Sequence, residues 1–215
     1  MKRALAILIG IVVVAVFIGL CYGFLKLSDA FSGYVIRGSR PIPGDAAHFD
    51  VITTYPQIAA FAGTDFHLER VSMKFVKSDG TLDLTADYGA SVSYYFAHVL
   101  DKSAANGAPV GVSNSVGPTA ELAFVNISKP GLKSPNKNQY YDFGMDRSAS
   151  TATAWTGTLA DVPTCSLKAL WDAAIQKGAS AEAVATIDYD STGYRFVIQA
   201  LNIRLQFAAN CSLLS

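Results

Sequence analysis

Residues 187–198 read IDYDSTGYRFVI, and this stretch decides how the C-terminal third of the chain folds. Apolar and polar side chains alternate on both sides of a short polar segment, a pattern typical of two half-buried strands joined by a tight turn. The segment contains Asp190 and Gly193, residue types that chain reversals favour. We therefore predict a hairpin whose strands cover residues 183–189 and 194–199.

A helix is expected before this hairpin and one more strand after it. The helix is predicted because apolar residues recur at helical spacing and are followed by Lys177-Gly178, a last-turn cation and a stop signal. Residues 201–207 predict the further strand. Residues 165–215 are thus expected to form a helix followed by a three-stranded meander. The apolar residues of the predicted helix are Leu167, Leu170, Trp171, Ala174 and Ile175.

The same order of signals occurs earlier in the chain, over residues 45–127. Asp45 offers an N-cap for a helix that Pro56 is expected to break or kink and Gly63 to end. The Asp79-Gly80 pair then predicts the tight turn of a hairpin. The strands predicted in this unit cover residues 71–75, 82–86, 91–100 and 119–127. Both faces of the third of these strands are apolar, which is typical of a central strand.

The two units resemble each other in sequence. KFVKSDGTLDLTA, from Lys74, aligns with IDYDSTGYRFVI, from Ile187, when the two turns are superposed. This alignment predicts an internal duplication of an α-β-β-β unit. The alternative is that any two meanders with Asp- and Gly-containing turns look alike. Residues 128–164, between the units, are predicted to be an irregular connection, in which residues 148–158 are either one more strand, packed at Trp155, or irregular chain.

The N-terminal residues 1–26 are predicted to form a transmembrane anchor. Residues 4–25 contain no charged side chain and no proline, and as a helix they would extend roughly 33 Å, enough for the hydrocarbon core of a bilayer. Residues 27–44 are predicted to form a stalk stiffened by prolines. A cleaved signal peptide and a lipoprotein modified at Cys21 are the alternatives.

These elements give a predicted fold class and location. The fold class is α+β: an N-terminal transmembrane helix, then one or more antiparallel sheets with one helix per α-β-β-β unit, with duplication as an open hypothesis. The location is the cell membrane, with a single pass, the N-terminus in the cytoplasm and the rest periplasmic or extracellular. Cys165 and Cys211 bracket the C-terminal unit and are predicted to form a disulfide, which suits an oxidising compartment.

Several classes of function are disfavoured by the sequence. The formal net charge is zero, so a nucleic-acid partner is not expected. The chain contains no G-x-S-x-G, C-x-x-C or H-E-x-x-H motif and no glycine-rich phosphate loop, so no catalytic residue, metal or cofactor is predicted. A calcium-loop pattern beginning at Asp188 has Gln199 where the bidentate glutamate should stand.

Exposed sheet surface and aromatic loop surface are the remaining candidates for function. Our first hypothesis is a non-enzymatic binding or envelope-assembly module that binds a protein or polymer partner in the envelope, in addition to the bilayer contacts of residues 4–25. The alternatives are an envelope hydrolase with an unrecognised site and a carrier of small ligands. The residues predicted to form the binding surface are Tyr140, Tyr141, Phe143 and Trp155.

The order of a helix followed by a meander resembles the PepSY and β-lactamase-inhibitor-like modules of bacterial envelope and secreted proteins. SDGTLDLTA at residues 78–86 and GYRF at residues 193–196 are similar to stretches of uncharacterised single-span bacterial envelope proteins. The resemblance covers about half of the chain and implies a module that binds or inhibits other proteins. It implies no functional residue.

Overall fold

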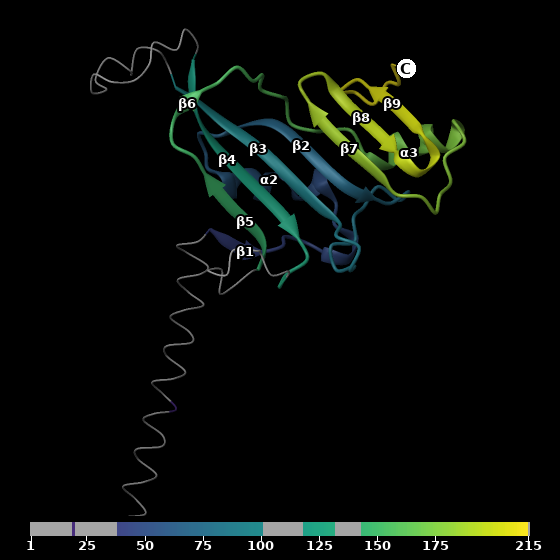
Figure 1. The fold of residues 1–215 in the computed structure, drawn as a ribbon, viewed down its shortest axis with the longest axis horizontal. Helices are drawn as coiled ribbons and strands as arrows, with labels where there is room; N and C mark the ends of the chain where they lie inside the picture. The colour runs from purple at the N-terminus through teal and green to yellow at the C-terminus, as the bar shows by residue number, and fades with distance from the viewer. Residues whose placement is uncertain (1–18, 20–37, 101–117, 132–142, 215) are drawn as a thin grey trace, which may run out of the picture.

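The computed structural model of the chain describes Gly19 and residues 38–100, 118–131 and 143–214. In these residues the strands form one sheet that is antiparallel at every pairing, and the two α-helices lie behind it in Figure 1. The helices are α2 (Val51–Ala62) and α3 (Leu167–Gln176). In sheet order the strands are β1 (Ser39–Pro41), β5 (Gly144–Ala149), β4 (Thr119–Ser128), β3 (Ser91–Leu100), β2 (His67–Val76), β7 (Ala185–Asp190), β8 (Gly193–Ile198) and β9 (Ile203–Phe207), and β6 (Thr153–Ala154) pairs with β4.

The pair β2–β7 is the seam of the sheet. From it β2, β3 and β4 run outward in chain order on one side, and β7, β8 and β9 do the same on the other. Helix α2 precedes the first of these meanders and α3 precedes the second. Both halves therefore have the order α-β-β-β with the first strand innermost, which is the strand order that a duplication requires. The duplication itself stays a prediction.

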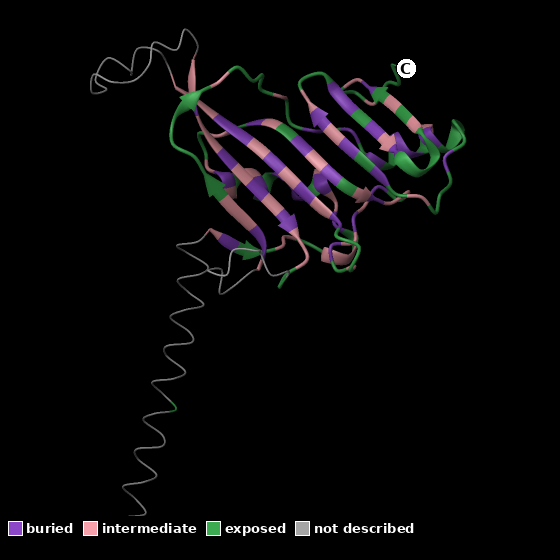
Figure 2. Cartoon of the chain, viewed as in Figure 1, coloured by how far each residue is buried: buried purple, intermediate pink, exposed green. Residues whose placement is uncertain are grey.

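One core fills the space between the helices and the sheet. Along the strands buried residues alternate with more exposed ones, as the banding in Figure 2 shows. On β3 the residues that belong to this core are Val92, Tyr94 and Phe96, which point toward the helices. Under the second half, the Trp171 ring of α3 meets the Phe196 ring of β8 edge to face, with centroids 5.1 Å apart. The opposite face of the sheet has no described helix against it and is called the open face below.

Helix α2 differs from the prediction at its start and at its middle. Asp50, and not Asp45, is the N-cap, and its carboxylate accepts a hydrogen bond from the Ile52 N–H at 2.8 Å. Asp45 instead caps the short 3-10 turn Ala46–His48. The helix continues through Pro56, so the expected break is wrong. Pro56 lies on the exposed side, where it removes one backbone hydrogen bond while the buried side keeps its packing.

The predicted hairpin over residues 71–86 is also wrong. The turn forms, since the Lys77 N–H donates to the Thr81 carbonyl at 2.8 Å, but residues 82–86 do not form a strand. Leu82 instead makes an isolated bridge with Phe49, and Leu82 and Leu84 are both fully buried at the end of the core. The strand β2 pairs with β3 and β7, which satisfies its backbone on both edges.

The segments predicted as a connection and as a stalk both contribute strands to the sheet. The stretch 128–164 contains β5 and β6, which both pair with β4. The stalk predicted over residues 27–44 contains β1, which pairs with β5 at the edge of the sheet. In both cases the pairing partner is distant in sequence, and short local patterns do not reveal such partners.

The predicted fold class requires a correction at its N-terminal element. No helix in the described ranges is long and apolar enough to cross a membrane, and the fold seen there is a single antiparallel sheet covered on one face by two helices. The span predicted over residues 4–25 lies outside the described residues apart from Gly19. The remaining part of the class, α+β with one helix before each meander, agrees with the observed elements.

Candidate functional site: the open face of the sheet

A row of side chains, the aromatic row, crosses the open face of the first half and reaches the seam. Its members stand directly opposite one another on neighbouring strands, because the strand registers pair each residue with the next. In sheet order the row is Ser148 (β5), Phe124 (β4), Tyr95 (β3), Arg70 (β2) and Asp190 (β7).

The middle of the aromatic row is held by ring contacts. The rings of Tyr95 and Phe124 meet edge to face with centroids 5.0 Å apart. The guanidinium of Arg70 lies 3.9 Å from the centroid of the Tyr95 ring, a distance at which a cation is attracted to the face of the ring. Both rings are half-buried. The stacked arginine keeps an apolar surface in place while its N–H groups stay available to a ligand.

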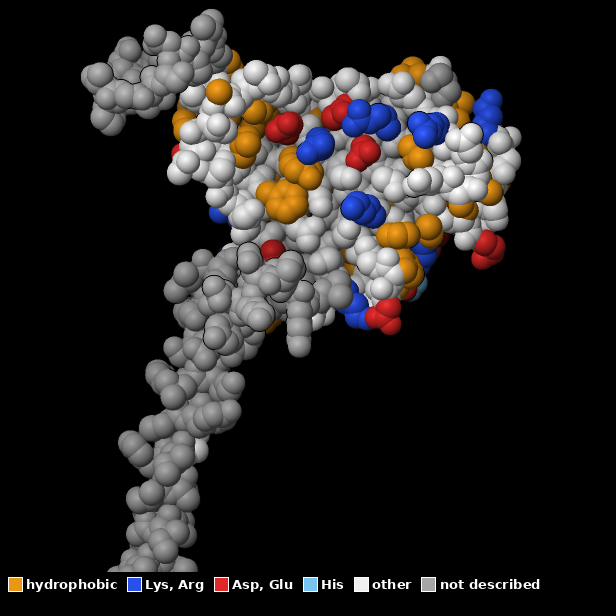
Figure 3. All heavy atoms as spheres, in the orientation of Figure 1, with side chains coloured by type: hydrophobic (Ala, Val, Ile, Leu, Met, Phe, Trp, Pro, Cys, Tyr) orange, Lys and Arg blue, Asp and Glu red, His pale blue; other side chains and the backbone are white. Residues whose placement is uncertain are grey.

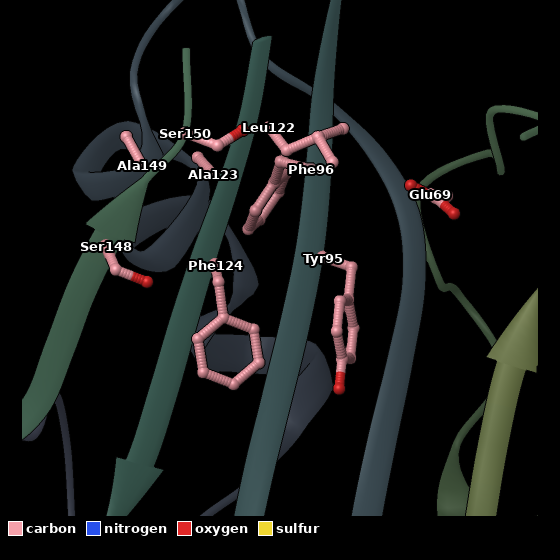
Figure 4. A pocket seen from close by; sticks show the side chains of 9 residues that line it. All are labelled: Glu69, Tyr95, Phe96, Leu122, Ala123, Phe124, Ser148, Ala149 and Ser150. Atoms are coloured by element: carbon pink, nitrogen blue, oxygen red, sulfur yellow. The ribbon is translucent and has the colours of Figure 1, made fainter. Parts of the chain in front are cut away.

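A β-bulge interrupts β2 next to these rings. Leu68 pairs with Phe96 and Arg70 pairs with Tyr95, so Glu69 is the extra residue on β2. Beside it lies an open hollow of about 310 Å³. Figure 4 shows Tyr95 and Phe124 on neighbouring strands of this hollow, with Leu122 above them and Glu69 at the β2 side. The other residues that line the hollow are Phe96, Ala123, Ser148, Ala149 and Ser150.

A second row, the polar row, runs beside the aromatic row from β5 to β7 and continues to β9. On the strands that both rows share, each residue of the polar row lies two positions along the strand from a residue of the aromatic row. On β8 and β9 the polar row continues with the residues that pair in register with Asp188 and then with Arg195. The Ser93 hydroxyl donates to the Asn126 side-chain oxygen at 3.0 Å. In sheet order the polar row is Asp146, Asn126, Ser93, Ser72, Asp188, Arg195 and Gln206.

Figure 3 shows how these rows divide the open face. Hydrophobic side chains gather over β3 and β4, and acidic and basic side chains are interspersed over the middle of the sheet. One ion pair joins the two rows, since the Arg195 guanidinium lies 3.1 Å from the Asp190 carboxylate. The open face therefore combines an aromatic patch with a balanced set of charges.

The aromatic surface predicted from the sequence is not assembled in the described part of the chain. Tyr140 and Tyr141 lie outside the described residues. Phe143 precedes β5 and donates its backbone N–H to the Ser39 hydroxyl at 3.1 Å. Trp155 follows β6, where its backbone N–H donates to the Pro118 carbonyl at 3.0 Å. These two residues thus lie at opposite ends of β4, roughly 35 Å apart at the usual rise per strand residue.

Tyr95 and Phe124 were missed as site residues. The available signal is the apolar character of both faces of residues 91–100, from which only a central strand is predicted. The strand is central, between β2 and β4, and among the described residues a helix lies on only one of its faces. The position of Phe124 opposite Tyr95 depends on a pairing of strands that are far apart in sequence.

The two predicted disulfide partners meet at the end of the C-terminal unit. The sulfur atoms of Cys165 and Cys211 lie 2.00 Å apart and their Cα atoms 5.5 Å apart. Cys165 is buried just before α3, and Cys211 lies in the tail after β9. In this tail the Leu214 N–H donates to the Gln206 carbonyl at 2.8 Å. The bond therefore fastens α3 to the chain segment that folds back along the edge strand β9.

The calcium-loop pattern has a structural explanation. The Asp190 carboxylate accepts hydrogen bonds from the Thr192 N–H at 2.8 Å and from the Thr192 hydroxyl, which closes the turn between β7 and β8. The same aspartate pairs with Arg195. Among the described residues no three acidic, histidine or cysteine side chains are grouped as a metal site requires.

Comparisons of the chain with protein-family models, with curated proteins and with solved structures found no match.

Proposed function

We propose that this protein is a non-enzymatic binding protein of an extracytoplasmic compartment and that its ligand lies on the open face over Tyr95 and Phe124. The observation that carries the proposal is the pair of half-exposed rings beside an open hollow, on a face that has no described helix against it. Aromatic and arginine side chains dominate the binding energy of many interfaces, and here both kinds lie in contact.

The shape of the site favours binding over catalysis or storage. A hydrolase is expected to have a deep pocket in which polar groups converge, and a carrier a closed apolar cavity. The hollow beside Tyr95 is open, and mostly apolar side chains and small residues line it. The resemblance to modules that bind or inhibit other proteins points the same way, by analogy only.

The extracytoplasmic location is supported by the disulfide. Bonds such as that between Cys165 and Cys211 persist in oxidising compartments and are rare in the cytosol, where thiols are kept reduced. Trapping of free thiols by alkylation in intact cells, followed by mass spectrometry, is expected to leave both cysteines unmodified. Alkylation of both would contradict this part of the proposal.

Site-specific photo-crosslinking in the cells that make the protein tests the binding surface. A benzophenone amino acid replaces Phe124 in the full-length chain, and the matched control carries it at Ile175, an exposed hydrophobic position on α3. Crosslinked products are expected from position 124 and at most background from position 175. Equal yields from the two positions, or products from position 175 only, would overturn the proposal.

A further inference from the structure

We infer that the ligand of the open face is a neutral polysaccharide chain that lies across the sheet along the polar row, with a sugar ring against Tyr95 and Phe124. This inference rests on the proposed function and names the chemical class of its ligand. It is carried by the placement of the polar row beside the aromatic row.

The polar row offers an extended ligand a regular set of hydrogen-bonding groups. Hydroxyl, amide, carboxylate and guanidinium groups follow one another from Asn126 on β4 to Gln206 on β9, so donors and acceptors are both present along this part of the row. Neighbouring strands lie about 4.8 Å apart, and this part of the row therefore spans roughly 24 Å. That spacing is close to the length of one sugar unit in an extended β-linked chain, so successive sugars would meet successive strands.

The aromatic row supplies the apolar surface that the polar row lacks. A pyranose ring has hydroxyl groups around its edge and C–H groups on its faces, and those faces pack well on aromatic rings. Tyr95 and Phe124 stand two residues along their strands from Ser93 and Asn126, at a distance of roughly 7 Å. One sugar unit is wide enough to contact a ring with its face and the polar row with its edge.

The charges of the open face favour a neutral chain over an anionic polymer. Acidic and basic side chains are interspersed (Figure 3), and Arg195 is already paired with Asp190. Nucleic acids and other polyanions bind through clustered positive charge that displaces their counterions. No such cluster is seen among the described side chains of this face.

The polar row also favours a polysaccharide over a protein partner. A protein interface that covered Ser72, Ser93, Asn126 and Asp188 would remove their polar atoms from water, which costs free energy unless each atom gains a hydrogen bond. A polysaccharide has a hydroxyl group for nearly every such atom. It also leaves water between many of the contacts, which weakens binding little.

Binding of the full-length protein to cellulose, chitin and β-1,4-mannan tests the inference, with heparin as an anionic probe. Depletion isotherms and affinity electrophoresis are expected to show retention by at least one neutral polysaccharide, unaffected by added salt. Phe124→Leu keeps an apolar side chain but removes the ring, and Asn126→Ala removes one hydrogen-bonding group. Each is expected to weaken binding at least tenfold. Gln176→Ala, an exposed position at the end of α3 on the other side of the sheet, also removes an amide and is the matched control, which is expected to change binding less than twofold.

Each other outcome of this experiment counts against the inference. Absence of retention on all three neutral polysaccharides overturns it, and so does binding to heparin alone with a steep dependence on salt. If photo-crosslinking from position 124 captures a protein and no polysaccharide retains the chain, the inferred ligand class is wrong and the proposed binding surface stands. If position 124 gives no crosslinks, the proposed function is overturned as well. Circular dichroism of each variant separates loss of binding from loss of folding.

Discussion

Gly80 shows how one residue couples the two halves of the molecule. It adopts a left-handed backbone conformation with φ +83°, and a Cβ atom placed there would lie 2.5 Å from the Lys168 backbone nitrogen at the start of α3. Gly89 has nearly the same conformation, with φ +80°, but no atom lies within 4 Å of a Cβ placed there. The two glycines therefore form a matched pair that separates backbone strain from a steric clash.

We predict that Gly80→Ala destabilises the protein more than Gly89→Ala does. A left-handed conformation costs an alanine roughly 1 kcal/mol, and both variants bear this cost. Only Gly80→Ala also pushes the turn away from α3, so its total loss is expected to be about 3 kcal/mol. Urea unfolding of both variants measures the difference. Equal losses would show that the turn does not press against α3.

Carboxylates in the turns make the free energy of unfolding depend on pH. The Thr85 hydroxyl, which donates to Asp83 at 2.6 Å, lowers the pKa of that carboxyl below its ordinary value of 3.8, and the ammonium of Lys129 lowers the pKa of Asp87. A carboxyl whose pKa is lower in the folded than in the unfolded state contributes stability at pH values above the unfolded pKa. This contribution is lost as the pH falls through the folded value.

The protein is therefore expected to be less stable at pH 3 than at pH 7. Asp83→Asn keeps an oxygen acceptor for Thr85 but carries no charge, so its stability is expected to fall less over the same range. Urea midpoints of the wild type and of Asp83→Asn at both pH values measure the two slopes. An equal fall in both proteins would assign the acid sensitivity to other groups.

Residue types alone predicted the position of the turns better than they predicted the site. The reversal at Asp190–Gly193 follows from local chemistry, and the structure has its turn there. Tyr95 and Phe124 become a site only through the register that places them opposite each other. The two strands are separated in sequence and pair through tertiary contacts, which local sequence patterns do not reveal.

At the scale of elements, the disulfide carries a measurable share of the stability. The bond between Cys165 and Cys211 closes a loop with a sequence separation of 46, for which the chain-entropy model gives roughly 4 kcal/mol. We predict that Cys165→Ser/Cys211→Ser lowers the free energy of unfolding by about that amount, and that reduction of the wild type does the same. Guanidinium unfolding with and without reductant measures both, and an unchanged midpoint in either would contradict the prediction.

Elements with strong local periodicity were predicted well, and those that depend on distant partners were not. The helix α3 and the strands β7, β8 and β9 agree with the sequence pattern. In contrast, the hairpin expected after Lys74 is replaced by a loop whose Leu82 and Leu84 enter the core. Their alternation with polar residues is typical of a strand. Both side chains instead fill the end of the core, because a protein interior is closely packed.

At the scale of the whole molecule, the seam between β2 and β7 makes the two halves depend on each other. Val71 of β2 pairs with Tyr189 of β7, and Met73 with Ile187, all of them buried. A fragment of residues 165–215 would expose the edge of β7 and the apolar side of α3, and it is small for an independent domain. We predict that the fragment stays unfolded alone. A cooperative unfolding transition of the isolated fragment, by near-ultraviolet circular dichroism, would contradict this.

If the open face is the surface that binds, the ligand covers its side chains in the cell, and hydroxyl-radical footprinting measures their protection. The full-length protein is oxidised in its native cells and, separately, after purification, and the modified side chains are counted by mass spectrometry. The account predicts that Leu122, Tyr95 and Phe124 are modified less in cells, whereas the exposed Ile175 of α3 is modified equally in both. Equal modification of the open face in the two samples, with protection confined to α3, would contradict the account.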